Sequence, residues 1–405
     1  MPSVIPPLPA DFIANIGQLT LPEIAYEVAS ALLDDAIPSD ALKAIINDAV
    51  NFDAPARRLD KNTYVLELFH GPSLAFKDFG ARFMSRVMAY FLKDDDQLLD
   101  ILVATSGDTG GAVALGFLAV PRTRVTILYP KGKVSEIQEL QLCTNGQNIH
   151  ALEVNGTFDD CQRLVKQAFS DEALNAKLRL TSANSINIAR LIPQTFYYFW
   201  AYAQLKKQGK EAVVFAVPSG NFGNLAAGLI AHQMGLPVKQ FIAATNANDT
   251  VPRYLETGVY EARPAVSTYA NAMDVGAPSN WVRIMDLFKQ DRSELLKRVK
   301  GYTFSDEETL EAIEALYEKY GYVACPHTAI AWRALKSYQE ASPADTFAGA
   351  FLSTAHPCKF PDVFPANIAA GIAQPPQVEE LRSKVKQVVA IEADFKDFKA
   401  YLLGL

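Results

Sequence analysis

The chain has 405 residues, of which 49% are hydrophobic and 20% charged, a composition typical of a globular protein with two or more domains. Its net charge of −7, from 38 basic and 45 acidic residues, disfavours nucleic acid as the main partner, although a local pocket can still bind a small anion. No basic residue precedes Lys43, so neither a secretory signal nor a transit peptide is predicted and we expect a cytoplasmic protein.

Helix-capping signals dominate the first 60 residues. Thr20, Pro22 and Glu23 supply an N-cap, a first-turn proline and the acid of a capping box, while Ser39 is the expected cap of a second helix. In chain order, these signals predict a helix over 21–37, a helix continuing to Val50 and a strand over 64–69.

Short apolar runs then alternate with helical segments. The first series predicts strands over 100–105, 124–129 and 149–154, with helices near 110–120, 135–145 and 158–170. After a polar stretch, 171–190, a second series has strands over 212–217 and 240–244, then helices at 281–299 and 305–320 and a strand at 346–352. Such alternation is typical of parallel sheets with crossover helices, so the fold class is α/β, with two doubly wound lobes and a cleft between them.

Two further patterns exclude functions. The longest uncharged run, residues 212–238, contains Pro218, His232 and several other polar residues, so it is too polar for a bilayer. The cysteines form no C-x-x-C pair and the histidines no H-x-x-x-H pair, so we expect reduced, mostly buried thiols and no metal site.

Ligands of doubly wound folds bind beyond the carboxyl ends of strands, which directs attention to four loops. The first, 70–80, contains Lys77 between Phe76 and Phe79. Apolar surroundings lower the pKa of an amine, and a neutral amine is a nucleophile. The alternative is a solvated lysine on the first turn of a helix.

The second and third loops are rich in glycine and hydroxyl side chains. Loop 104–112 can bring backbone amides and hydroxyls to an anion at a helix N-terminus, and loop 218–224 has the character of a phosphate cradle. Capped or plain turns are the alternatives. Loop 218–224 matches neither the dinucleotide fingerprint nor the P-loop. In the fourth loop, 352–358, a hydroxyl can reach the ring nitrogen of a ligand, but a capped β-turn explains it equally well.

From about residue 20 to 400, these motifs together resemble the threonine synthase family, pyridoxal-phosphate (PLP) enzymes with the fold of tryptophan synthase β and cysteine synthase. The most specific pieces are His70-Gly-Pro-Ser-Leu-Ala-Phe-Lys-Asp-Phe-Gly80, Ala104-Thr-Ser-Gly-Asp-Thr-Gly110 and Ser182-Ala-Asn-Ser-Ile-Asn-Ile-Ala-Arg190. Ala243-Ala-Thr-Asn246, Asn271-Ala-Met-Asp274 and Thr354-Ala-His-Pro357 follow in the order of the family.

The resemblance implies a role for each loop. Lys77 holds PLP and is the catalytic residue, and Thr354 faces the pyridine nitrogen. The phosphate loop of the cofactor is Gly220, Asn221, Phe222, Gly223 and Asn224. The carboxylate of the substrate is bound by Thr105, Ser106, Gly107 and Thr109. In the same loop, Asp108 lies opposite the 3′ oxygen of PLP. The phosphate of the substrate is bound by Asn184, Ser185 and Arg190, with Ser106 and Thr109.

The implied reaction converts O-phospho-L-homoserine and water into L-threonine and phosphate. The implied domains are a helical N-terminal segment over 1–60, a smaller lobe over 78–185, and a larger PLP-binding lobe of 61–77 plus 186–405. No nucleic acid, membrane or metal is expected, and a monomer and a dimer are equally compatible with the sequence.

Three departures and two alternatives accompany this interpretation. Asp108 stands where related folds often carry Asn, and Cys325 stands where Glu or Asp is usual before a Pro-His pair. Met1-Pro-Ser starts inside the first stretch of the family, so we expect a shortened beginning. The alternatives are a related PLP lyase or dehydratase acting on serine or threonine, and a ligand-binding scaffold without catalysis.

Overall fold

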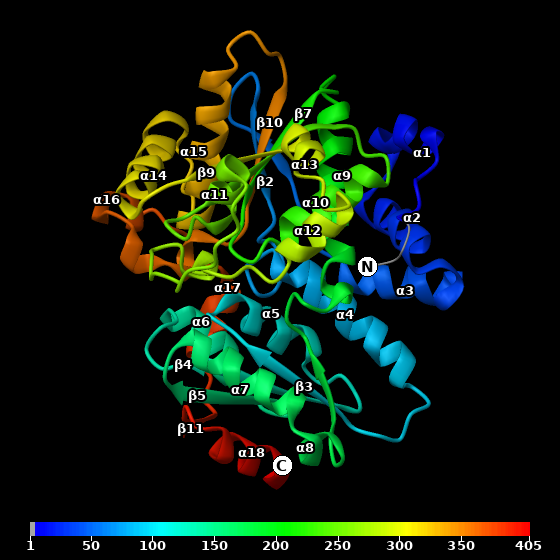
Figure 1. The fold of residues 1–405 in the computed structure, drawn as a ribbon, viewed down its shortest axis with the longest axis vertical. Coiled ribbons are helices and arrows are strands. Elements are labelled where there is room, and N and C mark those ends of the chain that lie inside the picture. Colours follow the sequence, from blue (N-terminus) through cyan, green and yellow to red (C-terminus); the bar gives the residue numbers. More distant parts are fainter. Residues whose placement is uncertain (1–4) are drawn as a thin grey trace. The chain divides into compact units, whose positions relative to one another are not determined.

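The structure, a computed structural model, describes residues 5–405, so the expected shortened beginning at Met1-Pro-Ser lies outside the described residues. The chain folds into two compact units (Figure 1). Unit one comprises the described residues up to Phe76 together with Leu191–Ile372, and unit two comprises Lys77–Arg190 together with Ala373–Leu405.

Unit two is built on a five-stranded, all-parallel sheet in the order β11-β5-β4-β3-β6. Its strands are β3 (Leu99–Ala104), β4 (Thr123–Pro130), β5 (Ile149–Asn155), β6 (Arg179–Ser182) and β11 (Val388–Glu392). Its helices are α4 (Lys77–Leu92), α5 (Asp108–Phe117), α6 (Glu136–Cys143), α7 (Phe158–Ser170), α8 (Glu172–Asn175), η3 (Ile188–Arg190), α17 (Pro376–Arg382) and α18 (Phe395–Gly404).

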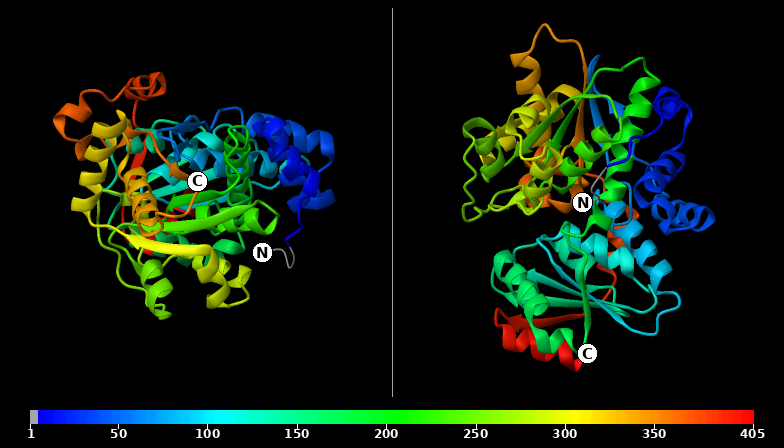
Figure 2. Two further views of the ribbon diagram at one scale, coloured as in Figure 1. Left: turned by 90° about the horizontal axis from the view of Figure 1, so that it is seen from above. Right: turned by 45° about the vertical axis from the view of Figure 1, so that its right-hand side comes forward.

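Side chains of this sheet alternate between two cores, as the period of two along a strand requires. On one face, Ile101 and Val103 pack with apolar residues of α4, α5 and α6. On the other face, Leu102 and Ala104 pack with residues of α7, α8 and α18. Helices α7 and α18 therefore lie on the same face of the sheet (Figure 2). Unit two is therefore a three-layer α/β/α body, as the sequence predicts for a doubly wound lobe.

Unit one contains a six-stranded sheet in the order β1-β2-β10-β7-β8-β9, parallel except for β1. Its strands are β1 (Ala56–Arg58), β2 (Thr63–Glu67), β7 (Val213–Pro218), β8 (Val238–Thr245), β9 (Val299–Thr303) and β10 (Ala348–Ser353). Its longer helices are α2 (Leu21–Leu33), α3 (Ser39–Ala49), α9 (Ile192–Lys206), α10 (Gly223–Gln233), α14 (Asp306–Tyr320) and α15 (Pro326–Ala341). Its shorter ones are α1 (Ala10–Asn15), η1 (Ile16–Gln18), η2 (Asp34–Ala36), α11 (Thr250–Thr257), η4 (Asn271–Met273), α12 (Trp281–Leu287), α13 (Arg292–Arg298), η5 (Pro357–Lys359), η6 (Pro361–Val363) and α16 (Ala366–Ala369).

Helices cover both faces of this sheet as well. Val214 and Ala216 face a core formed with α14 and α15. On the opposite face, Tyr198 of α9 makes edge contacts with the rings of Phe215 and Phe241. The uncharged run 212–238 forms β7 and α10 inside this fold, and none of the helices within residues 5–405 has the length and apolarity that crossing a bilayer requires.

The predicted cap at Thr20 is confirmed and two helix predictions need correction. Complete capping boxes open α2 at Thr20 and α14 at Ser305. Pro38, not Ser39, is the N-cap of α3. The helix expected over 281–299 is divided into α12 and α13, because the chain between them turns through left-handed φ values at Lys289 and Gln290.

The C-terminal residues differ from the expected division of the chain. The sequence interpretation placed 61–77 and 186–405 in the larger lobe, whereas Lys77, residues 186–190 and the segment from Ala373 onward belong to unit two. There β11 pairs in parallel with β5, and Phe398 and Leu402 of α18 complete the core beside α7. The apolar run at 388–391 is compatible with a strand, but nothing in it indicates that the strand pairs with β5, far earlier in the chain.

This packing predicts a measurable difference between two residues of α18. Phe398 is fully buried, so Phe398→Ala should lower the free energy of unfolding of unit two by about 3–5 kcal/mol through lost burial and a residual cavity. Leu403 is 42% exposed, and Leu403→Ala should change stability by less than about 0.5 kcal/mol. Chemical denaturation followed by far-UV circular dichroism measures both, and equal losses would contradict the placement of α18.

Candidate active site

The predicted site residues of unit two lie at the carboxyl ends of two neighbouring strands. Loop 105–109 follows β3, and Asn184 and Ser185 follow β6, which pairs in parallel with β3. Asn184 joins the two ends directly, because its Nδ2 donates to the Ala104 carbonyl (2.8 Å) and its Oδ1 accepts the Ala104 amide (3.2 Å). These bonds favour a role for Asn184 in holding the two loops together.

Loop 105–109 is a compact turn organised by one hydroxyl. Thr105 Oγ1 accepts the amides of Gly107 (3.0 Å) and Gly110 (2.8 Å), and Thr105 itself is buried. Gly107 has a φ of 131°, a conformation that residues with a Cβ rarely adopt. Ser106 and Thr109 are only half-buried, so their hydroxyls are the more accessible ones of this loop.

Asp108 is the first residue of α5 and is buried. Its Oδ1 accepts a hydrogen bond from Gln138 Nε2 at 3.0 Å. Gln138 comes from α6 and is also the third residue of the capping box that Ser135 opens. A glutamine of another helix therefore holds the carboxylate that the sequence places near the cofactor.

Lys77 is the first residue of α4 and its side chain retains only partial exposure. Burial, reinforced by the positive charge of Arg190, lowers the pKa of the Lys77 amine to about 8, against the opposing attraction of Asp108. The structure therefore brings three of the predicted site residues close enough to interact electrostatically. A larger fraction of this amine is neutral near neutral pH than for an ordinary lysine.

Arg190 is almost completely buried. Its Nη1 donates to the Ala183 carbonyl at 2.5 Å, and a Cβ on Gly80 of α4 would lie 2.7 Å from its Nε. Burial lowers the pKa of this guanidinium to about 10, while the charge of Asp78 acts in the opposite direction. Gly80 thus makes room for a buried cation next to the N-terminal turn of α4.

In unit one, the predicted phosphate loop connects β7 to the N-terminus of α10. Phe222 is in the left-handed conformation (φ 60°), and the helix begins at the next residue, Gly223. The Asn224 side chain braces the turn from within, because its Oδ1 accepts from Ser219 Oγ (2.6 Å) and its Nδ2 donates to the Pro218 carbonyl (2.8 Å). The first amides of a helix have no partner within the helix, and the local dipole favours an anion there.

Two further segments of unit one, at Met273 and at Ser279, contact the predicted phosphate loop. A Cβ on Gly220 would lie 2.5 Å from the Cα of Met273 and 2.8 Å from its carbonyl oxygen. One residue further, Asn221 Oδ1 accepts from the amide (2.6 Å) and the hydroxyl (3.0 Å) of Ser279. The glycine is therefore required where two backbones meet, and the asparagine ties the loop to the segment ahead of α12.

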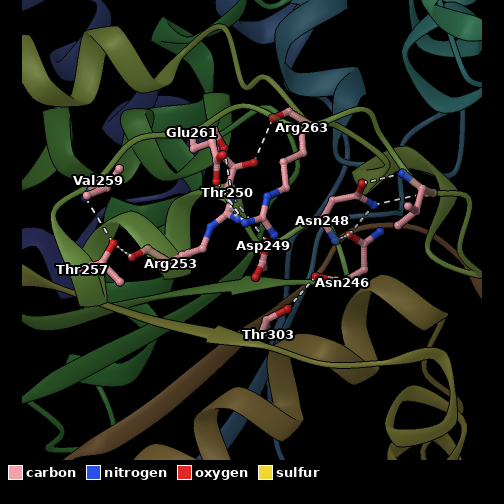
Figure 3. Close-up of polar contacts among 12 residues, drawn as sticks. Asn246, Asn248, Asp249, Thr250, Arg253, Thr257, Val259, Glu261, Arg263 and Thr303 are labelled. Carbon is pink, nitrogen blue, oxygen red and sulfur yellow. Dashed lines mark hydrogen bonds and ion pairs between the residues drawn. The ribbon is translucent and has the colours of Figure 1, made fainter.

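The segment that carries Met273 is itself anchored by a polar network after β8, and Figure 3 shows three of its members, Asn246, Asn248 and Thr303. Asn246 Nδ2 donates to Asp274 Oδ1 (2.8 Å), and Thr303 Oγ1 donates to the Asn246 carbonyl (2.7 Å). Asn248 Nδ2 also donates to Asp274 Oδ1 (3.3 Å). Burial raises the pKa of the Asp274 carboxyl to about 6, against the hydrogen bonds that favour its ionised form.

Thr354 follows β10, which pairs in parallel with β7, so it lies at the same edge of the sheet as the phosphate loop. Its carbonyl accepts the Phe76 amide at 2.8 Å, and its amide donates to Thr328 Oγ1 at 3.3 Å. Thr354 is buried, and these two bonds fix its backbone. Cys325, which has no assigned role in the sequence, is the N-cap of α15 and lies 3.1 Å from Thr328 Oγ1 through its Sγ.

Sequence reasoning missed the residues that hold the predicted ones in place. Some do so by hydrogen bonds: Gln138 to Asp108, Ser279 to Asn221 of the predicted phosphate loop, and Thr328 to Thr354. Others do so by close packing: Gly80 against Arg190 and Met273 against Gly220. Ser135 and Gln138 do form a capping-box pattern, but that pattern gives no sign of a partner 30 residues earlier. Within residues 5–405 no cluster of three or more His, Cys, Asp or Glu side chains is arranged to hold a metal ion.

Comparisons with known proteins match these features to one family. Residues 49–349 match the model of "Pyridoxal-phosphate dependent enzyme", and residues 328–402 match "Threonine synthase, C-terminal". The chain is 46% identical over 402 residues to threonine synthase of Haemophilus influenzae, covering 99% of this chain and 92% of that protein.

Two solved structures have the same fold over almost the whole chain. Threonine synthase from Escherichia coli superimposes with a TM-score of 0.92 at 42% identity, covering 100% of this chain and 92% of the other. PLP-bound threonine synthase from Brucella melitensis gives a TM-score of 0.90 at 34% identity, covering 99% and 92%.

The backbone contact beneath the phosphate loop predicts the effect of a single methyl group. Gly220→Ala forces the Met273 backbone to move, so it should lower the free energy of unfolding by about 1–3 kcal/mol and displace the loop. Gly17 is the control, since its Cβ would meet atoms only at 3.6 and 3.7 Å and Gly17→Ala should be neutral or slightly stabilising. Thermal unfolding measures both, and a Gly220→Ala chain as stable as the control would contradict the close approach.

Proposed function

Since the chain belongs to the threonine synthases, a family of pyridoxal-phosphate-dependent enzymes, we propose that its substrate is O-phospho-L-homoserine and that Lys77 holds the cofactor. The reaction converts this phosphate ester and water into L-threonine and phosphate, by loss of phosphate from the γ-carbon and addition of water at the β-carbon. The observation that carries the assignment of Lys77 is its amine at the start of α4, with a pKa lowered to about 8.

The residues of unit one fit the phosphate and ring of PLP. The phosphate fits the amides of Gly223 and Asn224 at the start of α10, and the backbone contact at Gly220 keeps the loop close-packed. The Thr354 hydroxyl would face the pyridine nitrogen, and a hydroxyl there leaves the ring less strongly protonated than a carboxylate does. When bound, PLP supplies an electron sink for the α-carbon of the substrate.

Lys77 has two tasks in this proposal. It first binds the cofactor through its amine, and the amine that the substrate releases then removes the proton from the α-carbon. A base works best when its pKa lies near the working pH, which the burial of Lys77 and the charge of Arg190 bring about. The same amine can return a proton later in the reaction.

The hydroxyls and amides of unit two supply the proposed grip on the substrate. Ser106 and Thr109 lie half-buried in loop 105–109, where amides and hydroxyls suit a carboxylate. Ser185 and Arg190 are proposed for the phosphate, since a guanidinium matches phosphate oxygens in a bidentate manner. Asn184 is proposed to position these loops through its bonds to Ala104.

A cytoplasmic location is part of the same proposal. It is supported by the four cysteines, which are buried thiols and not members of disulfides.

The function is tested by the release of inorganic phosphate from O-phospho-L-homoserine with the cofactor-loaded protein. We expect turnover of this substrate and little reaction with serine, whereas Lys77→Ala should lose activity by a factor of about a thousand or more because its base is gone. Phe91→Ala, at an exposed position of the same helix, is the control and should keep full activity. Comparable rates on serine would point instead to a related lyase or dehydratase.

Arg190→Ala separates substrate binding from cofactor binding. We expect the KM for O-phospho-L-homoserine to rise by about tenfold or more, because a charge-assisted phosphate contact is lost, while the cofactor stays bound. Steady-state kinetics and the visible absorbance of the cofactor measure the two effects separately. Loss of the cofactor with an unchanged KM would show that this arginine serves the cofactor and not the substrate.

A further inference from the structure

The side chain of Gln138 has an orientation that its partners determine. Its Oε1 faces the backbone amide of Ser135 at 3.0 Å, and because that N–H can only donate, the oxygen and not the nitrogen must lie there. Its Nε2 therefore points the other way and donates to Asp108 Oδ1 at 3.0 Å. Gln138 is completely buried, so solvent does not compete for either bond.

This geometry constrains the chemistry of Asp108. Oδ1 has to accept a hydrogen bond whether or not the carboxyl is protonated, so a proton on Asp108 can reside on Oδ2 and not on Oδ1. A donor aimed at a carboxylate also favours its ionised form. The close approach of the Gln138 side chain to Asp108 depends on Gly107, where a Cβ would lie only 2.4 Å from the Gln138 Cδ.

Charged groups from the neighbouring elements complete the surroundings of Asp108. Lys77 of α4 interacts with it electrostatically, and Arg190 of η3 acts on the same lysine. β4, which also packs against α5, carries Arg124, but this side chain is paired with Asp100 at 2.6 Å. From α6 it is the neutral Gln138 that contacts the carboxylate.

We propose that Gln138 is a positioning residue for the reaction, which holds Asp108 as an ionised hydrogen-bond acceptor beside Lys77 and so sets the charge that the cofactor-bearing amine experiences. The inference rests on the proposed function, because it assumes that Lys77 carries PLP. The competing role is purely structural, since Gln138 also completes the capping box of α6. A test must therefore preserve the cap while changing the bond to Asp108.

Gln138→Glu meets this requirement. Glutamate occupies the same capping-box position in α2 and α14 of this chain, as Glu23 and Glu308, so the cap of α6 is kept. The amide donor is replaced by a second carboxyl group facing Asp108. Gln138→Met removes the donor to Asp108 and the side-chain half of the capping box, while the Ser135 hydroxyl still accepts the backbone amide of residue 138. Gln141→Met is the matched control, because Gln141 is a buried glutamine one turn along α6 that packs against Gly111 of α5.

The readout is the visible absorbance spectrum of PLP in the holoenzyme, recorded from about pH 6 to about pH 10, a range that ends near the ordinary lysine pKa. Gln138→Glu places a second carboxyl group against Asp108, and the pair shares one proton at the lower end of this range. Loss of that proton as the pH rises adds negative charge near the amine nitrogen, which should move the pH midpoint of the spectral change upward. Gln138→Met makes Asp108 harder to ionise and should move it downward. Gln141→Met should match the wild type. In Gln138→Glu, which keeps the cap of α6, kcat should fall about tenfold relative to the wild type.

Two results would decide against the proposal in different ways. If the spectrum of Gln138→Glu superimposes on that of the wild type over the whole range, Gln138 is only a helix cap. If Lys77→Ala keeps an absorbance band that borohydride bleaches, the assignment of Lys77 is wrong, whatever the Gln138 variants do. Opposite shifts in Gln138→Glu and Gln138→Met, with an unchanged Gln141→Met, would support the electrostatic role.

Discussion

Transferring a lysine amine out of water disfavours its charged form, and at Lys77 a neighbouring cation adds to that effect. Burial and Arg190 together bring the pKa of this amine to about 8, while Asp108 partly opposes them. The two opposing charges are themselves fixed by packing, Arg190 against Gly80 and Asp108 against Gln138. The reactivity of one nitrogen therefore depends on the close packing of α4, α5, α6 and η3.

The anion binding proposed for this acidic protein depends on local geometry rather than on net charge. The proposed substrate and the cofactor each carry a phosphate. With a net charge of −7, the overall field of the chain does not attract such anions. It offers instead helix N-termini after β3 and β7, where glycines at 107 and 220 let the backbone turn or approach another segment closely. The polar network around Asp274 fixes the Met273 segment, which packs against Gly220 of the predicted phosphate loop.

Local sequence signals predicted individual strands and loops well. They did not predict the pairings and hydrogen bonds between residues that are far apart in the chain. Alternating apolar runs located β3, β4, β5, β7 and β8, and glycine-rich loops after strands identified the candidate site. The placement of β11 was not predictable, because its apolar residues do not indicate which strand they pair with and its partner β5 lies more than 200 residues earlier. Gln138 and Thr328 were missed for the same reason, since a buried hydrogen bond to a distant loop leaves no periodic pattern in the chain.

Of all the proposed roles, that of Lys77 as the residue that bears the cofactor can be tested most directly. Reduction of the PLP-loaded wild-type protein with borohydride, followed by proteolysis and mass spectrometry, locates the modified lysine directly. We expect one reduced cofactor per chain, attached to the peptide that contains Lys77. Attachment to any other lysine, or no stable attachment at all, would contradict this role.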